Sequence, residues 1–192
     1  MSLDLLEVVQ QKLGYPVLQK IDPNTQQVVE DDNTPDEHKF SQAAIPAVLT
    51  GLYNYVQSDA GATELLQSNE TTQWLSKIFN ESKKDAVQKI AAYAHQSNAD
   101  PMQKINAIAQ EAVKVVKENL SSNATVADVK LFMNTQKHTI LLYLPASLNM
   151  GELLNDNTLD DATNKMEGPI SSLIQSIGSA FSNTTTDDGL KK

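Results

Sequence analysis

The sequence predicts an all-α protein, a single domain built as a multihelical bundle of about six to eight helices. Helix-start patterns and apolar residues that recur at helical spacing predict this class. Residues 34–37 (TPDE) have the pattern of a threonine cap, a proline at the first helical position and a capping-box glutamate. An aspartate–proline pair at residues 100–101 and box-type starts at residues 82–85 and 125–128 predict three more helix starts.

Apolar spacing predicts helices near four ranges, 35–56, 83–97, 101–120 and 126–144. In the third range one helix face carries the apolar residues Ile105, Ile108, Ala109, Ala112, Val116 and Leu120. A shorter helix opens the chain, and Gly14 is its expected C-cap.

Residues 40–56 are apolar almost all round, which predicts the central and most buried helix. Pro46 within this helix is expected to remove one backbone hydrogen bond and to kink or split it. Residues 139–144 have strand propensity, but the chain offers no convincing partner strand, so a helix is predicted there. The acidic residues 21–33 are predicted to form an irregular loop, with at most a short strand-like stretch at residues 27–29.

The domain is expected to span residues 2–154. Residues 155–181, with a boundary at Gly168-Pro169, are predicted to form a helical extension packed on the domain, and residues 182–192 a disordered tail. The opening residues lack the pattern of a secretory signal. No apolar run approaches the roughly 20 residues that cross a bilayer. We therefore expect a cytoplasmic protein with no membrane span.

Composition excludes several kinds of chemistry. The chain has no cysteine, which excludes thiol catalysis, disulfides and thiolate-bound metals. Its 15 basic residues are all lysines and its formal net charge is −9, so the guanidinium that binds phosphate and guanine bidentately is missing. Residues 1–73 are strongly acidic and residues 74–137 are net basic. We expect Lys83, Lys84 and Lys89 to lie near carboxylates of the same chain, whereas an exposed lysine face would favour an acidic partner.

Three stretches of the sequence carry a family resemblance, LLEVVQQKLG, SQAAIPAVLTGLYNYVQSDAGATELL and WLSKIFNESKKDAVQKIAAYA. Residues 45–52 and 78–87 match an ALPALLGGL-type helix and an LFG…K…AV segment, and the chain thereby resembles the YidB-like family of bacterial proteins. Residues 131–154 are similar to a continuation in some relatives, so the resemblance covers roughly residues 3–154. The chain departs from the family in its acidic loop and after residue 154. The resemblance implies an all-α domain of unknown function and carries over no activity, cofactor or catalytic residue.

Metal-binding patterns are weak in the sequence. No HxxxH, HxH or HExxH spacing relates the three histidines, His38, His95 and His138. Asp156–Glu167 matches a calcium loop at positions 1, 5 and 12 but has Asp161 where that loop needs glycine. The acidic loop that begins at Asp22 does not fit the calcium-loop pattern either, because its positions 6 and 12 are Gln27 and Asn33. We therefore predict no cofactor and no metal, and no calcium at physiological levels in Asp156–Glu167.

Patterns for catalysis and for nucleic-acid binding are also missing. No GxSxG, SxxK or phosphate-loop pattern is present, although a triad assembled by the fold stays open. Trp74 and Phe79 are expected in the core, with a solvated face formed by Lys77, Lys83, Lys84 and Lys89. The net charge opposes phosphate contacts, so no nucleic-acid partner is predicted.

The predicted function is therefore non-enzymatic, a protein–protein interaction or assembly module that binds another protein or itself. Close helix approach is permitted by the small residues Ala43, Ala44, Ala47 and Gly51. The alternative is a small-molecule-binding or hydrolytic protein with a pocket between helices. Converging carboxylates with strongly shifted pKa values would favour that alternative.

Overall fold

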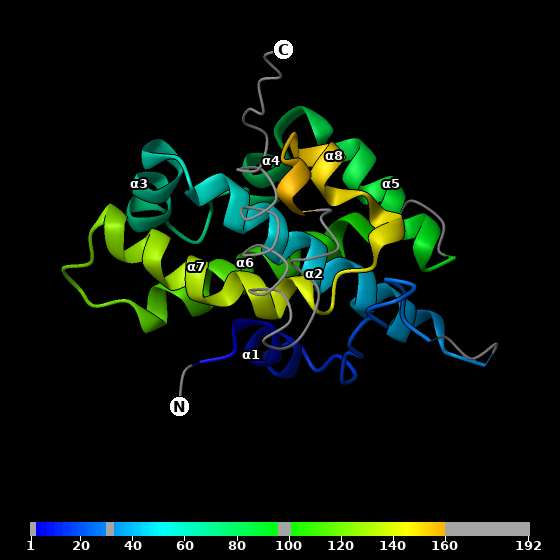
Figure 1. Cartoon of the computed structure of the whole chain (residues 1–192). Coiled ribbons are helices and arrows are strands. Elements are labelled where there is room, and N and C mark those ends of the chain that lie inside the picture. Colours follow the sequence, from blue (N-terminus) through cyan, green and yellow to red (C-terminus); the bar gives the residue numbers. More distant parts are fainter. Residues whose placement is uncertain (1–2, 30–32, 96–100, 160–192) are drawn as a thin grey trace, which may run out of the picture.

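The computed structural model describes residues 3–29, 33–95 and 101–159 (Figure 1). Within these ranges the regular elements are α-helices and short 3₁₀ turns, and no strand is present. The helices are α1 (Leu5–Lys12), α2 (Asp36–Val56), α3 (Asp59–Gln67), α4 (Trp74–Phe79), α5 (Lys83–Tyr93), α6 (Pro101–Asn119), α7 (Val126–Leu141) and α8 (Met150–Leu154). The turns are η1 (Asn80–Ser82), η2 (Ala146–Leu148) and η3 (Asn157–Leu159). The predicted all-α single domain is therefore confirmed.

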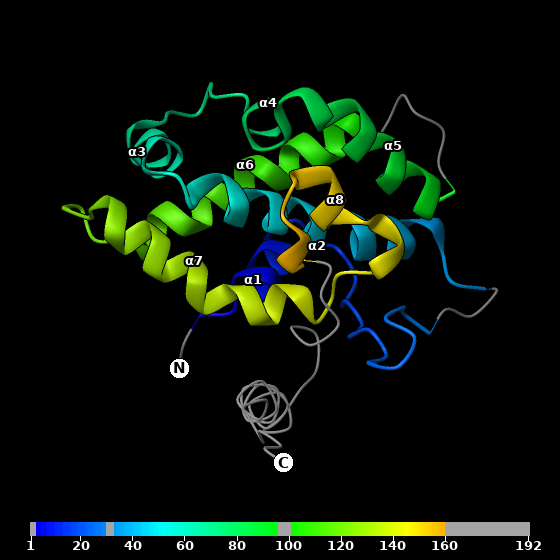
Figure 2. The same ribbon diagram turned by 45° about the horizontal axis from the view of Figure 1, so that its top comes forward.

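Helix α2 lies at the centre of the bundle, with α1 and α7 on one side and α4, α5 and α8 on the other (Figures 1 and 2). It packs against every other α-helix of the described part. Helix α6 packs against α1, α4 and α5 as well as α2. Every residue from Phe40 to Tyr53 is buried, as expected for a helix that is apolar all round. The prediction that this stretch forms the most buried helix is confirmed.

Pro46 does not split α2, which continues from Asp36 to Val56. A proline removes only its own N–H, and the carbonyl of Pro46 still accepts a hydrogen bond from the Thr50 hydroxyl at 2.7 Å. Helices pack on α2 from all sides. Their burial of both halves offsets the lost backbone bond. Of the two predicted alternatives, the split is wrong, and the kink stays a prediction.

Several predicted helix ends are confirmed and others need correction. Thr125 and Asp128 form the predicted capping box of α7. The C-cap of α1 is Leu13, and the expected C-cap, Gly14, is the next residue, with φ +70°. The N-cap of α2 is Pro35 instead of the predicted Thr34, so the helix begins one residue later than predicted. The Ser82 side chain does not cap α5. Helix α5 ends at Tyr93 and α7 at Leu141, each a few residues short of the prediction. The predicted cap at residue 100 lies outside the described residues.

A buried glutamine holds the loop before α2 in place. The Gln42 side chain accepts a hydrogen bond from the Gln19 amide at 2.8 Å and donates to the carbonyls of Gln19 and Tyr143, each at 2.9 Å. The Ile21 amide donates to the Leu142 carbonyl at 2.9 Å. The loop is therefore irregular, as predicted, but it is fixed to α2 and to the end of α7. Its residues 27–29 pair with no strand in the described ranges.

The chain continues to pack beyond residue 154. Leu159 is fully buried and lies in a notch lined by residues of α2 and α7, namely Thr50, Tyr53, Lys137, Ile140 and Leu141. Most of the predicted extension and the whole predicted tail fall in residues 160–192, outside the described part. No described helix is both long and apolar enough to cross a membrane.

Candidate functional site

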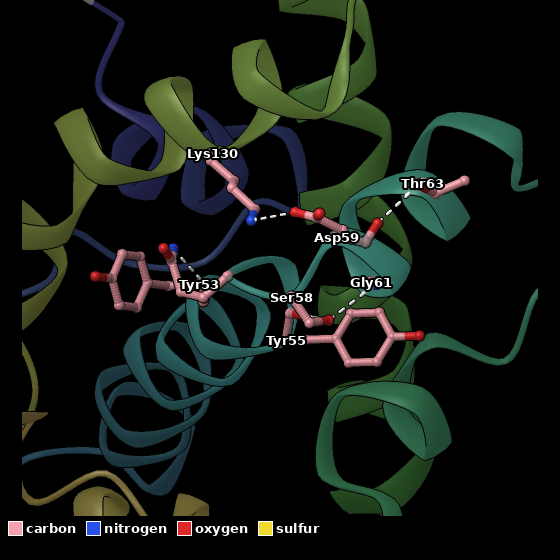
Figure 3. A network of polar contacts seen from close by, with 8 residues as sticks. Tyr53, Tyr55, Ser58, Asp59, Gly61, Thr63 and Lys130 are labelled. Carbon is pink, nitrogen blue, oxygen red and sulfur yellow. Dashed lines mark hydrogen bonds and ion pairs between the residues drawn. The ribbon is translucent and has the colours of Figure 1, made fainter.

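A polar network joins the end of α2 to α3 (Figure 3). The Ser58 hydroxyl accepts a hydrogen bond from the Gly61 amide at 3.0 Å and donates to the Tyr55 carbonyl at 3.1 Å. Lys130 of α7 lies 2.6 Å from the Asp59 carboxylate, whose pKa it lowers by hydrogen bonding and by charge. The Asp59 side chain is 86% exposed, so solvent screens this ion pair and it adds little to stability. These contacts fix a helix corner, and they converge on no reacting group.

A hollow of about 600 Å³ lies between the end of α2, the α4–η1 turn and α8. At its wall the Tyr55 hydroxyl donates a hydrogen bond to Glu64, and Lys77 forms an ion pair with the same carboxylate at 2.7 Å. Lys77 and Tyr55 together lower the pKa of Glu64. Lys83 donates to the Ser76 hydroxyl at 3.1 Å. These polar side chains thus already bind one another.

Tyr55 provides a pH-dependent prediction. Burial, with the neighbouring Glu64 carboxylate, raises the pKa of Tyr55 to about 12. An unfolded tyrosine titrates near about 10, so the folded state holds this proton more tightly and stability falls as pH rises from about 10 to about 12. In a phenolate absorbance titration, Tyr55→Phe should remove the component that titrates last. Loss of a component near pH 10 instead would contradict the assignment.

A second hollow, of about 690 Å³, runs along α6 beneath the loop that precedes α4. Trp74 and Val113 line it and are almost completely buried, with exposed fractions of 2% and 3%. Lys117 closes one side by donating to the Ser68 carbonyl at 2.6 Å. Trp74 also packs edge-on against the Tyr55 ring. Its predicted place in the core is confirmed, and Phe79 is buried too.

The basic middle of the chain pairs in part with the acidic first segment. Lys77 binds Glu64 and Lys130 binds Asp59, so two of its lysines meet carboxylates from residues 1–73. These two lysines are not the ones for which neighbouring carboxylates were predicted, namely Lys83, Lys84 and Lys89. In the described ranges no ion pair within 4 Å joins those three to a carboxylate, and Lys83 bonds to a serine instead.

The candidate metal residues do not converge. His38 lies in the first turn of α2, His138 in α7 and His95 just after α5, and all three are exposed. Among the described residues no group of three or more His, Asp or Glu side chains could hold a metal ion. The Asp22 carboxylate accepts hydrogen bonds from two following amides, which lower its pKa. Residues 160–167 of the calcium-like segment lie outside the described part, so its predicted failure to bind calcium stays a prediction.

A small groove at the start of α2 exposes apolar side chains. Val17 and Val29 are 82% and 77% exposed, more than any other large hydrophobic residue in the described part of the chain. Both line one shallow hollow between the loop and α2, with a volume of about 20 Å³. We call this hollow the valine groove, and it is lined by Val17, Gln19, Val28, Val29, Thr34, His38, Lys39 and Gln42. This hollow was not predicted from the sequence, although the valines at 17, 28 and 29 stand out in an otherwise polar loop.

No family model, curated protein or solved structure matches the chain. The resemblance to YidB-like proteins therefore stays a prediction.

Proposed function

We propose that the protein is a non-enzymatic binding module that docks an apolar segment of a partner protein in the valine groove. The supporting observation is that the two most exposed aliphatic side chains of the described part, Val17 and Val29, line the same hollow. Single exposed hydrophobic residues are normal on protein surfaces, whereas neighbouring ones that share a concave site are typical of interaction surfaces. The same proposal includes membership of the YidB-like family, whose domain has no assigned function.

The construction of the valine groove supports docking. Gln42, whose side chain is fixed by three hydrogen bonds, belongs both to the groove and to the buried helix α2. A fixed wall loses little conformational entropy when a partner binds. Full burial of a valine side chain contributes roughly 1.5 kcal/mol or more, so two valines would provide a useful share of a micromolar interaction.

The two larger hollows offer less to a partner. Among their apolar residues, Trp74, Val113 and Phe79 are at most 3% exposed, so covering these three removes little further surface from water. Leu153 and Leu154 beside the first hollow are half-buried. The polar walls of this hollow are largely bonded internally, as the Tyr55–Glu64–Lys77 contacts show. A partner would have to replace those contacts before gaining its own.

Substitution in the groove tests this function. Val17→Asp places a charge where the partner would bury a valine. The amount of partner protein recovered from host lysate should therefore fall about tenfold or more. Leu131→Asp is the matched control, because Leu131 is a 65% exposed hydrophobic residue of α7 outside the groove. The comparison is made by quantitative mass spectrometry of proteins bound to each full-length variant. Equal recovery by wild type and Val17→Asp would refute the docking role.

A second candidate function, small-molecule binding or hydrolysis, is favoured by the hollow beside α8. Its volume of about 600 Å³ lies in the usual range of ligand pockets, and its Ser76 hydroxyl contacts the Lys83 ammonium. A screen of small polar metabolites and esters by thermal shift and hydrolysis, with Ser76→Ala as the comparison, would test it. A ligand whose stabilisation or turnover disappears in Ser76→Ala would favour this function.

A further inference from the structure

The second hollow, along α6, is lined by a buried donor that has no acceptor. The Trp74 side chain is 2% exposed, yet no described residue accepts a hydrogen bond from its indole N–H. Buried indole N–H groups usually have an acceptor, and leaving such a donor unpaired costs free energy. Trp74 lines the hollow, so a molecule that fills the hollow lies against this side chain. The unpaired donor therefore points to an acceptor supplied by a ligand.

Unpaired side chains of both charges lie on two walls of this hollow. Glu70 belongs to the loop after α3 and Lys114 to α6, and both line the hollow. In the described ranges neither side chain forms a hydrogen bond or an ion pair within 4 Å. The side-chain amide of Gln110, one turn before Lys114 on α6, also makes no hydrogen bond with a described residue. One negative, one positive and one neutral polar group are therefore available to a ligand.

The charges around the hollow balance. Its lining contains three glutamates and two lysines, and Lys12 of α1 binds two of these glutamates, Glu111 at 3.4 Å and Glu118 at 2.6 Å. With Lys12 included, three carboxylates are matched by three ammonium groups, so no excess charge attracts ions of one sign. A ligand that carries one charge of each sign can pair with both Glu70 and Lys114. The balance therefore favours a zwitterion over a simple anion or cation.

We propose that this hollow binds short peptides of two or three residues through their free termini. The peptide ammonium pairs with Glu70, and the peptide carboxylate pairs with Lys114 and accepts the Trp74 indole N–H. Gln110 bonds to the peptide amide. The volume of about 690 Å³ lies in the usual range of ligand pockets and is more than a single amino acid fills. A polar ligand gains from these unpaired groups, whereas an apolar protein segment would gain little from the covered floor. The site is separate from the valine groove.

The single tryptophan of the chain gives this proposal a direct probe. Its indole N–H produces one signal in a proton–nitrogen correlation spectrum of the full-length protein. The ligand is an equimolar library of di- and tripeptides, used with free termini, with acetylated amino ends or with amidated carboxyl ends. We expect the free library at millimolar concentration to move the indole proton downfield, as a hydrogen bond to a carboxylate does. Amidation should weaken binding about tenfold, because it removes a charge-assisted bond from a buried donor. Acetylation should weaken binding about fivefold, because Glu70 is exposed.

Two variants test which terminus each wall binds. Lys114→Gln should weaken binding of the free library about fivefold and leave binding of the amidated library unchanged. Glu70→Gln should bind the free and the acetylated libraries equally. Lys84→Gln, which replaces an exposed lysine of α5 outside the hollow, is the matched control and should bind as wild type does. All three replaced side chains are exposed, so the fold is kept.

Several results would overturn the proposal. An indole signal that does not move with the free library would show that no such peptide binds beside Trp74. Equal shifts with the free and both blocked libraries would show that the termini are not recognised, and wild-type affinity in both Lys114→Gln and Glu70→Gln would exclude the two walls. Val17→Asp should leave the indole shift unchanged. Loss of partner recovery in Val17→Asp without any peptide binding would leave the docking role standing and this inference wrong.

Discussion

Replacing Gln42 with methionine is expected to lower the free energy of unfolding by about 3 kcal/mol. Methionine fills a similar volume but can neither donate nor accept the three hydrogen bonds that Gln42 makes to Gln19 and Tyr143. Gln42 is 5% exposed and Tyr143 is half-buried, so water can replace few of these bonds at the helix, although Gln19 itself is exposed. Each buried, unsatisfied backbone group costs about 1–3 kcal/mol. Urea unfolding followed by circular dichroism measures the change.

The matched control for this prediction is Gln11→Met. Gln11 is an exposed glutamine of α1 whose side chain donates to Glu7, and its replacement should change stability by less than about 0.5 kcal/mol. The Gln42 substitution should also weaken partner binding, because it releases the loop that carries Val17 from α2. If Gln42→Met and Gln11→Met destabilise equally, the glutamine does not anchor the loop.

Gly61→Ala is expected to cost about 3 kcal/mol, at the upper end of the range for overpacking. A Cβ at Gly61 would lie 2.1 Å from the Tyr55 carbonyl oxygen and 2.9 Å from the Ser58 hydroxyl. The carbonyl belongs to the last turn of α2, so it can yield only if the α2–α3 corner of Figure 3 opens. Thermal unfolding should show a fall in Tm of roughly 10 °C.

Gly51→Ala is the informative comparison for Gly61→Ala. Its added Cβ would lie 2.5 Å from a side-chain methyl of Ile78, with the ring of Phe79 next nearest at 3.0 Å. Side chains can shift where a backbone carbonyl cannot, so this variant should lose less stability, about 1–2 kcal/mol. If Gly61→Ala is as stable as wild type, the described α2–α3 corner is wrong.

The long helices could be predicted from the sequence because their signals are local. The Thr125–Asp128 box and the apolar stripe of α6 are short-range patterns, and both correspond to observed features. Helix α3 was not predicted, because it begins at a serine cap beside two small residues and carries few apolar side chains. The uninterrupted course of α2 through Pro46 depends on packing by distant helices, which no local rule includes.

The valine groove could not be predicted because it depends on contacts between residues distant in sequence. Gln42 was expected only as part of a buried helix, and its bonds join residues 23 and 101 positions away. The exposure of Val17 follows from those bonds, since they fix the loop with that side chain outward. Pairing of the lysines Lys77 and Lys130 with acids of the first segment likewise required the relative placement of α3, α4 and α7.

Photocrosslinking from the groove in the native host tests the docking role most directly. A benzophenone amino acid is placed at Val17, and in a parallel strain at Leu131, in the full chain. The account predicts a discrete adduct with another protein from position 17 that is missing from position 131. Identical adducts from both positions would contradict it.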